Sequence, residues 1–228
     1  MQDKKINKKL FKDRKRTNVL RQPEQRLISY LVSRIPKWLT PDGLTFIGIL
    51  GSVLILLAFV LAKYLSIYSL FLAPLGFFVN WFGDSLDGRI AYYREQPRKW
   101  YGFSLDIIMD WLSTVLIGLG YIIYTDPEFV YAGYFLVILY GWSMIIAQLR
   151  YKITDVYSID AGIVGPTEIR VIISLMILAE VFVPGSIDYS VSAIVLILLV
   201  INVADTRKLL QLGDQRDAIE REQKFKKP

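Results

Sequence analysis

Stretches of apolar residues recur along the chain and predict membrane-spanning helices. Six such windows stand out, at residues 44–62, 65–82, 103–124, 129–149, 169–183 and 189–204. Several of them reach the length of about 20 apolar residues that a helix needs to cross a bilayer. We therefore expect an all-α integral membrane protein with six transmembrane helices, of which the fifth is the shortest.

A segment before the first window has the pattern of an amphipathic helix. It reads EQRLISYLVSRIPKWL over residues 24–39. Helical spacing puts four apolar residues near one side of the helix, namely Leu27, Leu31, Ile35 and Trp38, with Ile28 and Val32 beside them. Pro36 and Pro41 separate this segment from the first span. Such a helix can lie in the membrane interface or pack against the ends of the spans, and the two arrangements are compatible.

Basic residues divide unequally between the two sides that six spans would create. Of the 27 Lys and Arg residues, only Lys63 falls in the connections after the first, third and fifth windows, so 26 lie on the other side with both termini. That side is expected to be cytoplasmic, because cytoplasmic connections carry the excess of basic residues. The net charge of +6 then reflects topology and attraction to anionic membrane lipids, and no nucleic-acid partner is expected.

These patterns divide the chain into three parts. Residues 1–40 form a basic cytoplasmic segment with the interfacial helix, residues 41–205 form the six-helix membrane domain, and residues 206–228 form a charged cytoplasmic tail. The tail alternates charges without a sustained apolar stripe, which favours a solvated helix or a disordered tail.

The absence of cysteine and histidine narrows the chemistry that the chain can perform. Thiolate metal sites and imidazole acid–base catalysis are excluded. Proton transfer must fall to carboxylates, Lys or Tyr, and a hard metal ion must be bound by oxygen ligands.

Two pairs of aspartates flank the connection between the second and third windows. If the second helix continues past its window, the i,i+3 spacing of Asp84 and Asp87 puts both on nearly the same face. The i,i+4 spacing of Asp106 and Asp110 does the same on the third helix. Four carboxylates close together beside an apolar slab repel one another, and a divalent cation such as Mg²⁺, Mn²⁺ or Ca²⁺ removes that penalty.

An acidic residue at the end of a span also has a simpler explanation, as a solvated side chain or a helix cap. That explanation suits isolated residues such as Asp126 and Asp188. Two spaced pairs on adjoining spans favour a functional site, because carboxylates within a membrane are usually functional.

Two glycines accompany the acidic pairs. Gly88 directly follows Asp87, and Gly102 lies one helical turn before Asp106. Bare backbone at these positions would let a ligand approach closely. Close helix–helix packing is an equally good explanation for either glycine alone.

The stretch from residue 84 to residue 110 resembles the signature of CDP-alcohol phosphotransferases, D-x-x-D-G-x-x-A-R followed by a spacer and G-x-x-x-D-x-x-x-D. The matching positions are Asp84, Asp87, Gly88, Ala91, Gly102, Asp106 and Asp110. Tyr92 stands where the signature has Arg, which leaves open what replaces the family arginine. The spacer at 93–101 is also one residue longer than usual.

The resemblance implies roles for the aspartates. Asp84, Asp87 and Asp106 would chiefly be ligands of Mg²⁺ or Mn²⁺, with two ions expected. Asp110 would be both a candidate metal ligand and the general base that activates the attacking alcohol.

The resemblance also implies binding residues for the substrates. The cytidine nucleotide would be bound by Gly88, Ala91 and Gly102, and by Thr45 in a TPDGLT segment like the one before the first span in relatives. An acceptor or its phosphate would be bound by Arg150, Lys152 and Arg170 in the connection before the fifth span. Ordinary topology-setting charge is the alternative for each of these three basic residues.

The function implied is metal-dependent transfer of a substituted phosphate from a CDP-linked donor to an alcohol, with release of CMP, in phospholipid biosynthesis. CDP-diacylglycerol is the favoured donor, and a CDP-alcohol of the choline or ethanolamine type with a lipid hydroxyl acceptor is the first alternative. A divalent cation transporter and an inactive family member that serves as an assembly partner are the others. Relatives also suggest a homodimer.

Overall fold

The computed structural model describes residues 20–155 and 165–225, and all regular secondary structure within these two stretches is helical. The elements are α2 (Arg21–Val32), α3 (Pro41–Tyr64), η1 (Ile67–Phe71), α4 (Leu72–Tyr93), α5 (Lys99–Tyr124), η2 (Pro127–Phe129), α6 (Val130–Thr154), α7 (Pro166–Phe182) and α8 (Ser186–Phe225). The predicted all-α class is confirmed for this part of the chain.

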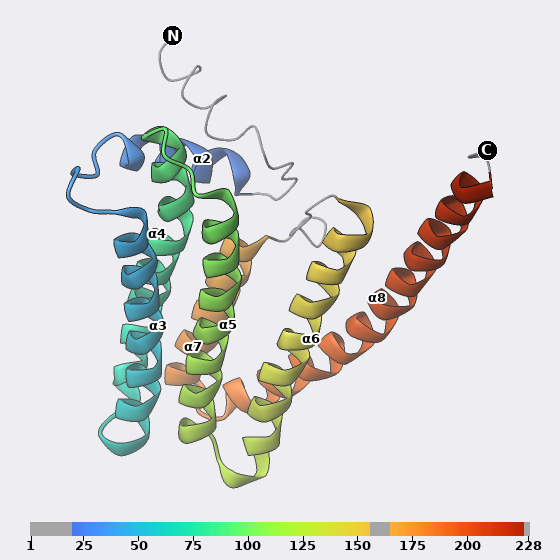
Figure 1. Cartoon of the computed structure of the whole chain (residues 1–228). Helices are drawn as coiled ribbons and strands as arrows, with labels where there is room; N and C mark the ends of the chain where they lie inside the picture. The colour runs from blue at the N-terminus through green and yellow to red at the C-terminus, as the bar shows by residue number, and fades with distance from the viewer. Residues whose placement is uncertain (1–19, 156–164, 226–228) are drawn as a thin grey trace.

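The helices α3 to α8 run up and down, and each contains one of the apolar windows or most of it. Figure 1 shows that the connections α3–α4, α5–α6 and α7–α8 lie at one end of the bundle. The α4–α5 connection and α2 lie at the opposite end, which we call the α2 end. Lys63, the one basic residue assigned from the sequence to these three connections, lies near the end of α3 that is opposite to α2.

Four of the described helical segments are long and apolar enough to cross a membrane, namely Pro41–Tyr64, Lys99–Tyr124, Pro127–Thr154 and Ser186–Gln223. They indicate an integral membrane protein. α7 has only 17 residues, and α4 carries Asn80, Asp84, Asp87 and Arg89. Membrane crossing by these two helices, the cytoplasmic side of the termini and a homodimer stay predictions.

Small residues bring α3 and α4 into backbone contact. A Cβ atom added at Gly83 would collide with the backbone of Gly48 and Leu44, and one added at Gly51 would collide with the backbone of Asn80. Larger side chains at these positions would therefore force the two helices apart. This close approach places the polar second half of α4 directly against the first turns of α3.

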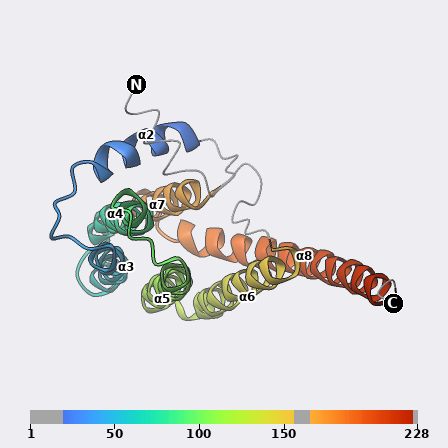
Figure 2. The same ribbon diagram turned by 45° about the horizontal axis from the view of Figure 1, so that its top comes forward.

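The helix α2 packs across the α2 end of the bundle, alongside α4 and α7 (Figure 2). Its buried residues Ile28 and Val32 contact a cluster that includes Trp81, Leu86 and Ile90 of α4. This contact agrees with the packing alternative, and a position in the membrane interface stays a prediction.

The helix α2 is shorter than the predicted amphipathic segment. It ends at Val32, so Trp38, at 78% exposed, lies beyond it. Within the helix, Ile28 and Val32 are buried and Leu27 is 44% exposed. The position of α4 decides which face of α2 is buried, and a pattern within one segment does not contain that information.

A carboxylate ties α2 to the start of α7. Glu24 is 5% exposed and accepts hydrogen bonds from Thr167 Oγ1 at 2.9 Å and from Trp81 Nε1 at 3.4 Å. Glu168 accepts a second bond from the backbone N–H of Leu20 at 2.8 Å. These contacts hold the first turn of α7 against α2 and α4, and α7 carries Arg170.

The charged tail continues α8 as a helix through Phe225, so of the two predicted forms the structure has the helical one. It is attached to α6, because Arg216 donates to the carbonyl oxygens of Lys152 (3.0 Å) and Ile153 and pairs with Asp155 at 3.6 Å. The guanidinium thus satisfies carbonyl groups that the end of α6 leaves without intrahelical partners.

Candidate functional site

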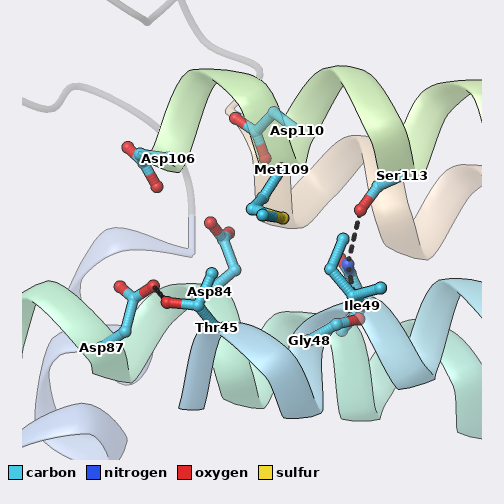
Figure 3. Close-up of a pocket in the computed structure, with 10 residues that line it drawn as sticks. Thr45, Gly48, Ile49, Asp84, Asp87, Asp106, Met109, Asp110 and Ser113 are labelled. Atoms are coloured by element: carbon cyan, nitrogen blue, oxygen red, sulfur yellow. Dashed lines mark hydrogen bonds between the residues drawn. The ribbon is translucent and has the colours of Figure 1, made fainter. Parts of the chain in front are cut away.

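A pocket between α3, α4 and α5 collects most of the residues that the sequence singles out. It is lined by Thr45, Gly48, Ile49, Asn80, Asp84, Asp87, Asp106, Met109, Asp110 and Ser113. Figure 3 shows Asp84 and Asp87 on one side of this pocket and Asp106 and Asp110 on the other. The structure therefore brings together all four predicted aspartates and Thr45.

Helix geometry explains why the four carboxylates meet. α4 continues beyond its apolar window to Tyr93, so Asp84 and Asp87 lie one turn apart on a regular helix. α5 begins at Lys99, which places Asp106 and Asp110 one turn apart on the neighbouring helix. Both pairs lie in the parts of α4 and α5 that adjoin the α4–α5 connection, which is at the α2 end of the bundle (Figure 1).

Asp87 is held by α3 and by its own helix. Thr45, which is 9% exposed, donates its hydroxyl hydrogen to Asp87 Oδ2 at 2.6 Å. The backbone N–H of Gly88 donates to Asp87 Oδ1. Both contacts favour the ionised carboxylate, since each donor points at a carboxylate oxygen.

Asp84 is held by a basic residue from a distant part of the chain. Arg170 Nη2 lies 2.6 Å from Asp84 Oδ2, and the two side chains are only 17% and 27% exposed. Arg170 Nε also donates to Asn80 Oδ1 at 2.9 Å. Arg170 is thus placed at the pocket wall, where it partly neutralises the acidic cluster.

The charge balance of the pocket favours a cation. Four carboxylates line one small pocket, and the Arg170 guanidinium pairs with one of them, Asp84. Carboxylate oxygens are the ligands that Mg²⁺ and Mn²⁺ prefer, so the chemistry of the donor set fits such ions. Within residues 20–155 and 165–225, however, no three acidic side chains are arranged to hold an ion as they stand. Metal binding therefore stays a prediction.

Gly88 and Gly102 differ from the glycines that pack α3 against α4. A Cβ atom added at either position would meet no atom within 4 Å. Helix packing therefore does not explain these two glycines among the described residues. They leave open backbone beside the carboxylates, as a ligand-binding role would require. Gly88, Gly102 and the half-buried Ala91 lie outside the lining of the carboxylate pocket.

Of the three predicted acceptor-binding residues, only Arg170 reaches the pocket. Arg150 instead pairs with Asp205 of α8 at 3.5 Å. Lys152 is exposed, and its carbonyl oxygen accepts a bond from Arg216. These contacts agree with structural and topological roles for Arg150 and Lys152.

The signature arginine has no obvious replacement on α4. Arg94 donates to the carbonyl oxygens of Leu39 at 2.8 Å and Pro36 at 2.9 Å, so it fastens the α2–α3 connection to the end of α4. Arg89 is buried, at 6% exposed. A guanidinium that contacts the pocket comes from α7, in Arg170.

The pocket also contains two polar residues that the sequence analysis did not predict, Asn80 and Ser113. Asn80 lies one turn before Asp84 on α4, and Ser113 lies one turn after Asp110 on α5. Extending the helical spacing of the acidic pairs into the apolar windows would have found both, because they share the faces of the aspartates.

An apolar groove adjoins the carboxylate pocket between α3 and α5. It is lined by Asp42, Thr45, Phe46, Ile49, Tyr101, Leu105, Met109 and Leu112, and it shares Thr45, Ile49 and Met109 with the pocket. Phe46 is 63% exposed, so one groove wall faces outward from the bundle. An ion pair between Arg98 and Asp42 adjoins the groove, with Arg98 stacked 4.1 Å over the ring of Tyr101.

Comparison with known proteins assigns the chain to a family. No curated protein matches it. The model of the CDP-alcohol phosphatidyltransferase family matches residues 38–204, which run from just before α3 into α8 and include every residue of the pocket. Because this match spans well over half of the chain, the protein belongs to the CDP-alcohol phosphatidyltransferase family.

Proposed function

We propose that this protein transfers a phosphatidyl group from CDP-diacylglycerol to an alcohol, with a divalent-metal requirement and release of CMP, in phospholipid biosynthesis. One observation carries the proposal, namely that four aspartates from two neighbouring helices line a single pocket. Membership in a transferase family that uses CDP-alcohol donors supports the type of reaction.

The aspartates would hold the ions. Asp84, Asp87 and Asp106 would be the main ligands of Mg²⁺ or Mn²⁺, with Asp110 as a further one. When bound, such ions neutralise the pyrophosphate oxygens and stabilise the departing CMP. Thr45 and Arg170 would keep Asp87 and Asp84 oriented for this task, since each donates to one oxygen of its carboxylate.

Asp110 would act as the general base. It would take the proton of the acceptor hydroxyl as the alcohol oxygen forms a bond to the phosphorus bearing the lipid. The bond from that phosphorus to the CMP oxygen would break, and CMP would leave with the electron pair. In support, Asp110 lines the same pocket as the three proposed metal ligands.

The apolar groove supports a substrate with acyl chains. A lipid whose phosphate lies at the aspartates could pass Ile49 and Met109 and lay a chain along Phe46, Leu105 and Leu112. The open backbone at Gly88 and Gly102 would receive the nucleotide. The concentration of basic residues at the α2 end supports a site on the cytoplasmic side.

The experiment is a CMP-release assay with purified full-length protein in lipid vesicles. Labelled CDP-diacylglycerol is supplied with inositol phosphate, glycerol phosphate, serine, choline or ethanolamine, with Mg²⁺, with Mn²⁺ or with a chelator. We expect CMP release that needs a divalent ion and one of the acceptors. Release only from CDP-choline or CDP-ethanolamine with diacylglycerol would overturn the proposed donor. Metal flux across the vesicle without nucleotide turnover would overturn the enzymatic function.

A further inference from the structure

Asn80 lies at the meeting point of four helices beside the carboxylate pocket. Its side-chain nitrogen donates to the carbonyl oxygen of Gly48 and to Ser52 Oγ, both at 3.1 Å, and lies 3.4 Å from Ser113 Oγ. Its side-chain oxygen accepts from Arg170 Nε at 2.9 Å. Asn80 is only 7% exposed, so α3, α5 and α7 hold this amide from all sides.

The partners of Asn80 fix the orientation of its amide group. A carbonyl oxygen such as that of Gly48 can only accept a hydrogen bond, and a guanidinium can only donate. The amide nitrogen must therefore face α3 and the amide oxygen must face Arg170. A flipped amide would turn an acceptor toward the Gly48 carbonyl oxygen and a donor toward Arg170 Nε, and both bonds would be lost in a buried place.

This orientation limits how Arg170 can bind Asp84. The Nε and Nη2 atoms form one edge of the guanidinium, which commonly grips both oxygens of a carboxylate. Here Nε donates its hydrogen bond to Asn80 Oδ1, and only Nη2 donates to Asp84, at Oδ2. Arg170 thus holds Asp84 by a single oxygen.

We propose that Asn80 is a positioning residue that engages Arg170 Nε and so keeps the guanidinium from closing over both oxygens of Asp84, leaving Asp84 able to bind a divalent cation. The inference rests on the metal requirement in the proposed function. It adds a residue outside the aspartate signature to the machinery of the site.

The test is a titration of purified full-length protein with Mn²⁺, followed by electron paramagnetic resonance, without substrate. In Asn80→Leu, which keeps the branched shape and the number of non-hydrogen atoms, Arg170 Nε loses its partner, and the guanidinium is expected to bind Asp84 through both Nε and Nη2. We expect Mn²⁺ binding to weaken about tenfold, the scale of one hydrogen bond to a charged group. Unchanged Mn²⁺ binding would overturn the proposal.

A double-mutant cycle separates positioning from simple structural support. Lysine has no forked edge, so in Arg170→Lys the Asn80→Leu change should weaken Mn²⁺ binding no further. An equal loss in both backgrounds would show that Asn80 acts through packing alone. Asn80→Ala serves if the leucine variant does not fold, because it removes the partner of Arg170 Nε without placing a larger apolar group against Gly48 and Ser52. It should weaken Mn²⁺ binding about as much as Asn80→Leu, and unchanged binding would contradict the proposal.

Asn202 provides a matched control at a distance from the pocket. It is 1% exposed, donates to the carbonyl oxygen of Leu139 at 2.7 Å and accepts from Ser143 at 2.6 Å, joining α6 to α8. Asn202→Leu should lower the unfolding temperature and leave Mn²⁺ affinity unchanged.

The inference and the proposed function can fail separately. If the wild type releases CMP with Mn²⁺ but the Asn80 variants bind Mn²⁺ normally, only the inference is wrong. If the Mn²⁺ affinities agree with the double-mutant cycle but no CDP-linked donor releases CMP, the proposed reaction is wrong and the role of Asn80 is still supported. A wild type that binds no Mn²⁺ would overturn the inference and the metal requirement together.

Discussion

Acidic side chains occur at both ends of this helical bundle, and the two groups have opposite surroundings. Away from α2, Glu180 is 2% exposed and accepts from Tyr124 Oη at 2.8 Å and from the backbone N–H groups of Gly185 (2.8 Å) and Ile187 (2.9 Å). Eight residues further along the chain, Asp188 accepts hydrogen bonds from Tyr121 Oη at 2.8 Å and from the Thr125 hydroxyl. At the α2 end, four aspartates surround a pocket.

The difference teaches how to distinguish structural acids from functional ones in a membrane protein. Glu180 and Asp188 are surrounded by neutral donors that belong to the fold, and they connect the turn between α7 and α8 to the end of α5. The pocket aspartates instead face one another, a geometry that costs free energy unless a cation joins them. Removing a carboxylate should therefore lower stability at one end and activity at the other.

The largest expected effect is the loss of turnover in Asp110→Asn. The amide cannot accept the proton of the acceptor hydroxyl, so CMP release should fall by about 100-fold or more. Thermal unfolding should occur at the same temperature or higher, because one of four like charges is removed. Asp126→Asn is the control, since Asp126 is exposed at the opposite end. Full turnover in Asp110→Asn would show that the proposed base is wrong.

The second effect is a loss of stability in Glu180→Gln. The glutamine keeps the size of the side chain, but its NH₂ group cannot accept from the backbone N–H groups that Glu180 now satisfies. We expect the protein to be destabilised by about 2 kcal/mol, the scale for a hydrogen bond to a buried charged group. Unfolding in detergent micelles measures the loss, and turnover below the transition should stay near the wild-type value.

Glu128→Gln is the control for this stability change, because Glu128 is exposed at the same end of the bundle. It should unfold like the wild type. If Glu180→Gln instead abolished CMP release without changing the unfolding transition, the division between structural and functional acids would fail.

The third effect concerns the contact between Thr45 and Asp87. Thr45→Ala removes the hydroxyl that donates to Asp87 at 2.6 Å, and we expect both Mn²⁺ affinity and turnover to fall about tenfold. Thr45→Ser should restore most of both. Thr114→Ala is a suitable control, because the Thr114 hydroxyl donates to a backbone carbonyl of its own helix. A change in the KM for the donor alone would place Thr45 at the nucleotide and away from the metal.

The acidic pairs were predictable because their spacing is local. Helix geometry alone puts Asp84 beside Asp87 and Asp106 beside Asp110 once both helices extend past the membrane edge. Arg170 is different, since it lies 86 positions from Asp84 in the sequence. The position of Arg170 next to Asp84 depends on how α7 packs against α4 and α2, and the pattern within one segment does not contain that information.

The same distinction explains which parts of the fold were predictable. The apolar windows coincide with helices because each window has a helical length and composition of its own. Burial of Ile28 in place of Leu27 is set by the surface of α4, and burial of Asp188, at 6% exposed, is set by its partners Tyr121 and Thr125. Of the two explanations offered for Asp188, burial contradicts the solvated side chain, whereas its place in the first turn of α8 agrees with a structural role at the start of a helix.

The smallest expected effect separates the glycines at the site from those that join α3 to α4. In Gly102→Ala the new methyl group meets no atom within 4 Å, so the helix should gain up to about 1 kcal/mol of stability from alanine's higher helix propensity. If open backbone at Gly102 receives the nucleotide, the KM for the CDP-linked donor should nevertheless rise a few-fold. Gly83→Ala is the counterpart, since its methyl group would collide with the backbone of Gly48 and should destabilise the protein. If Gly102→Ala has the wild-type KM for the donor, Gly102 does not belong to the proposed nucleotide site. The carboxylate pocket would then be the part of the signature that the chemistry needs.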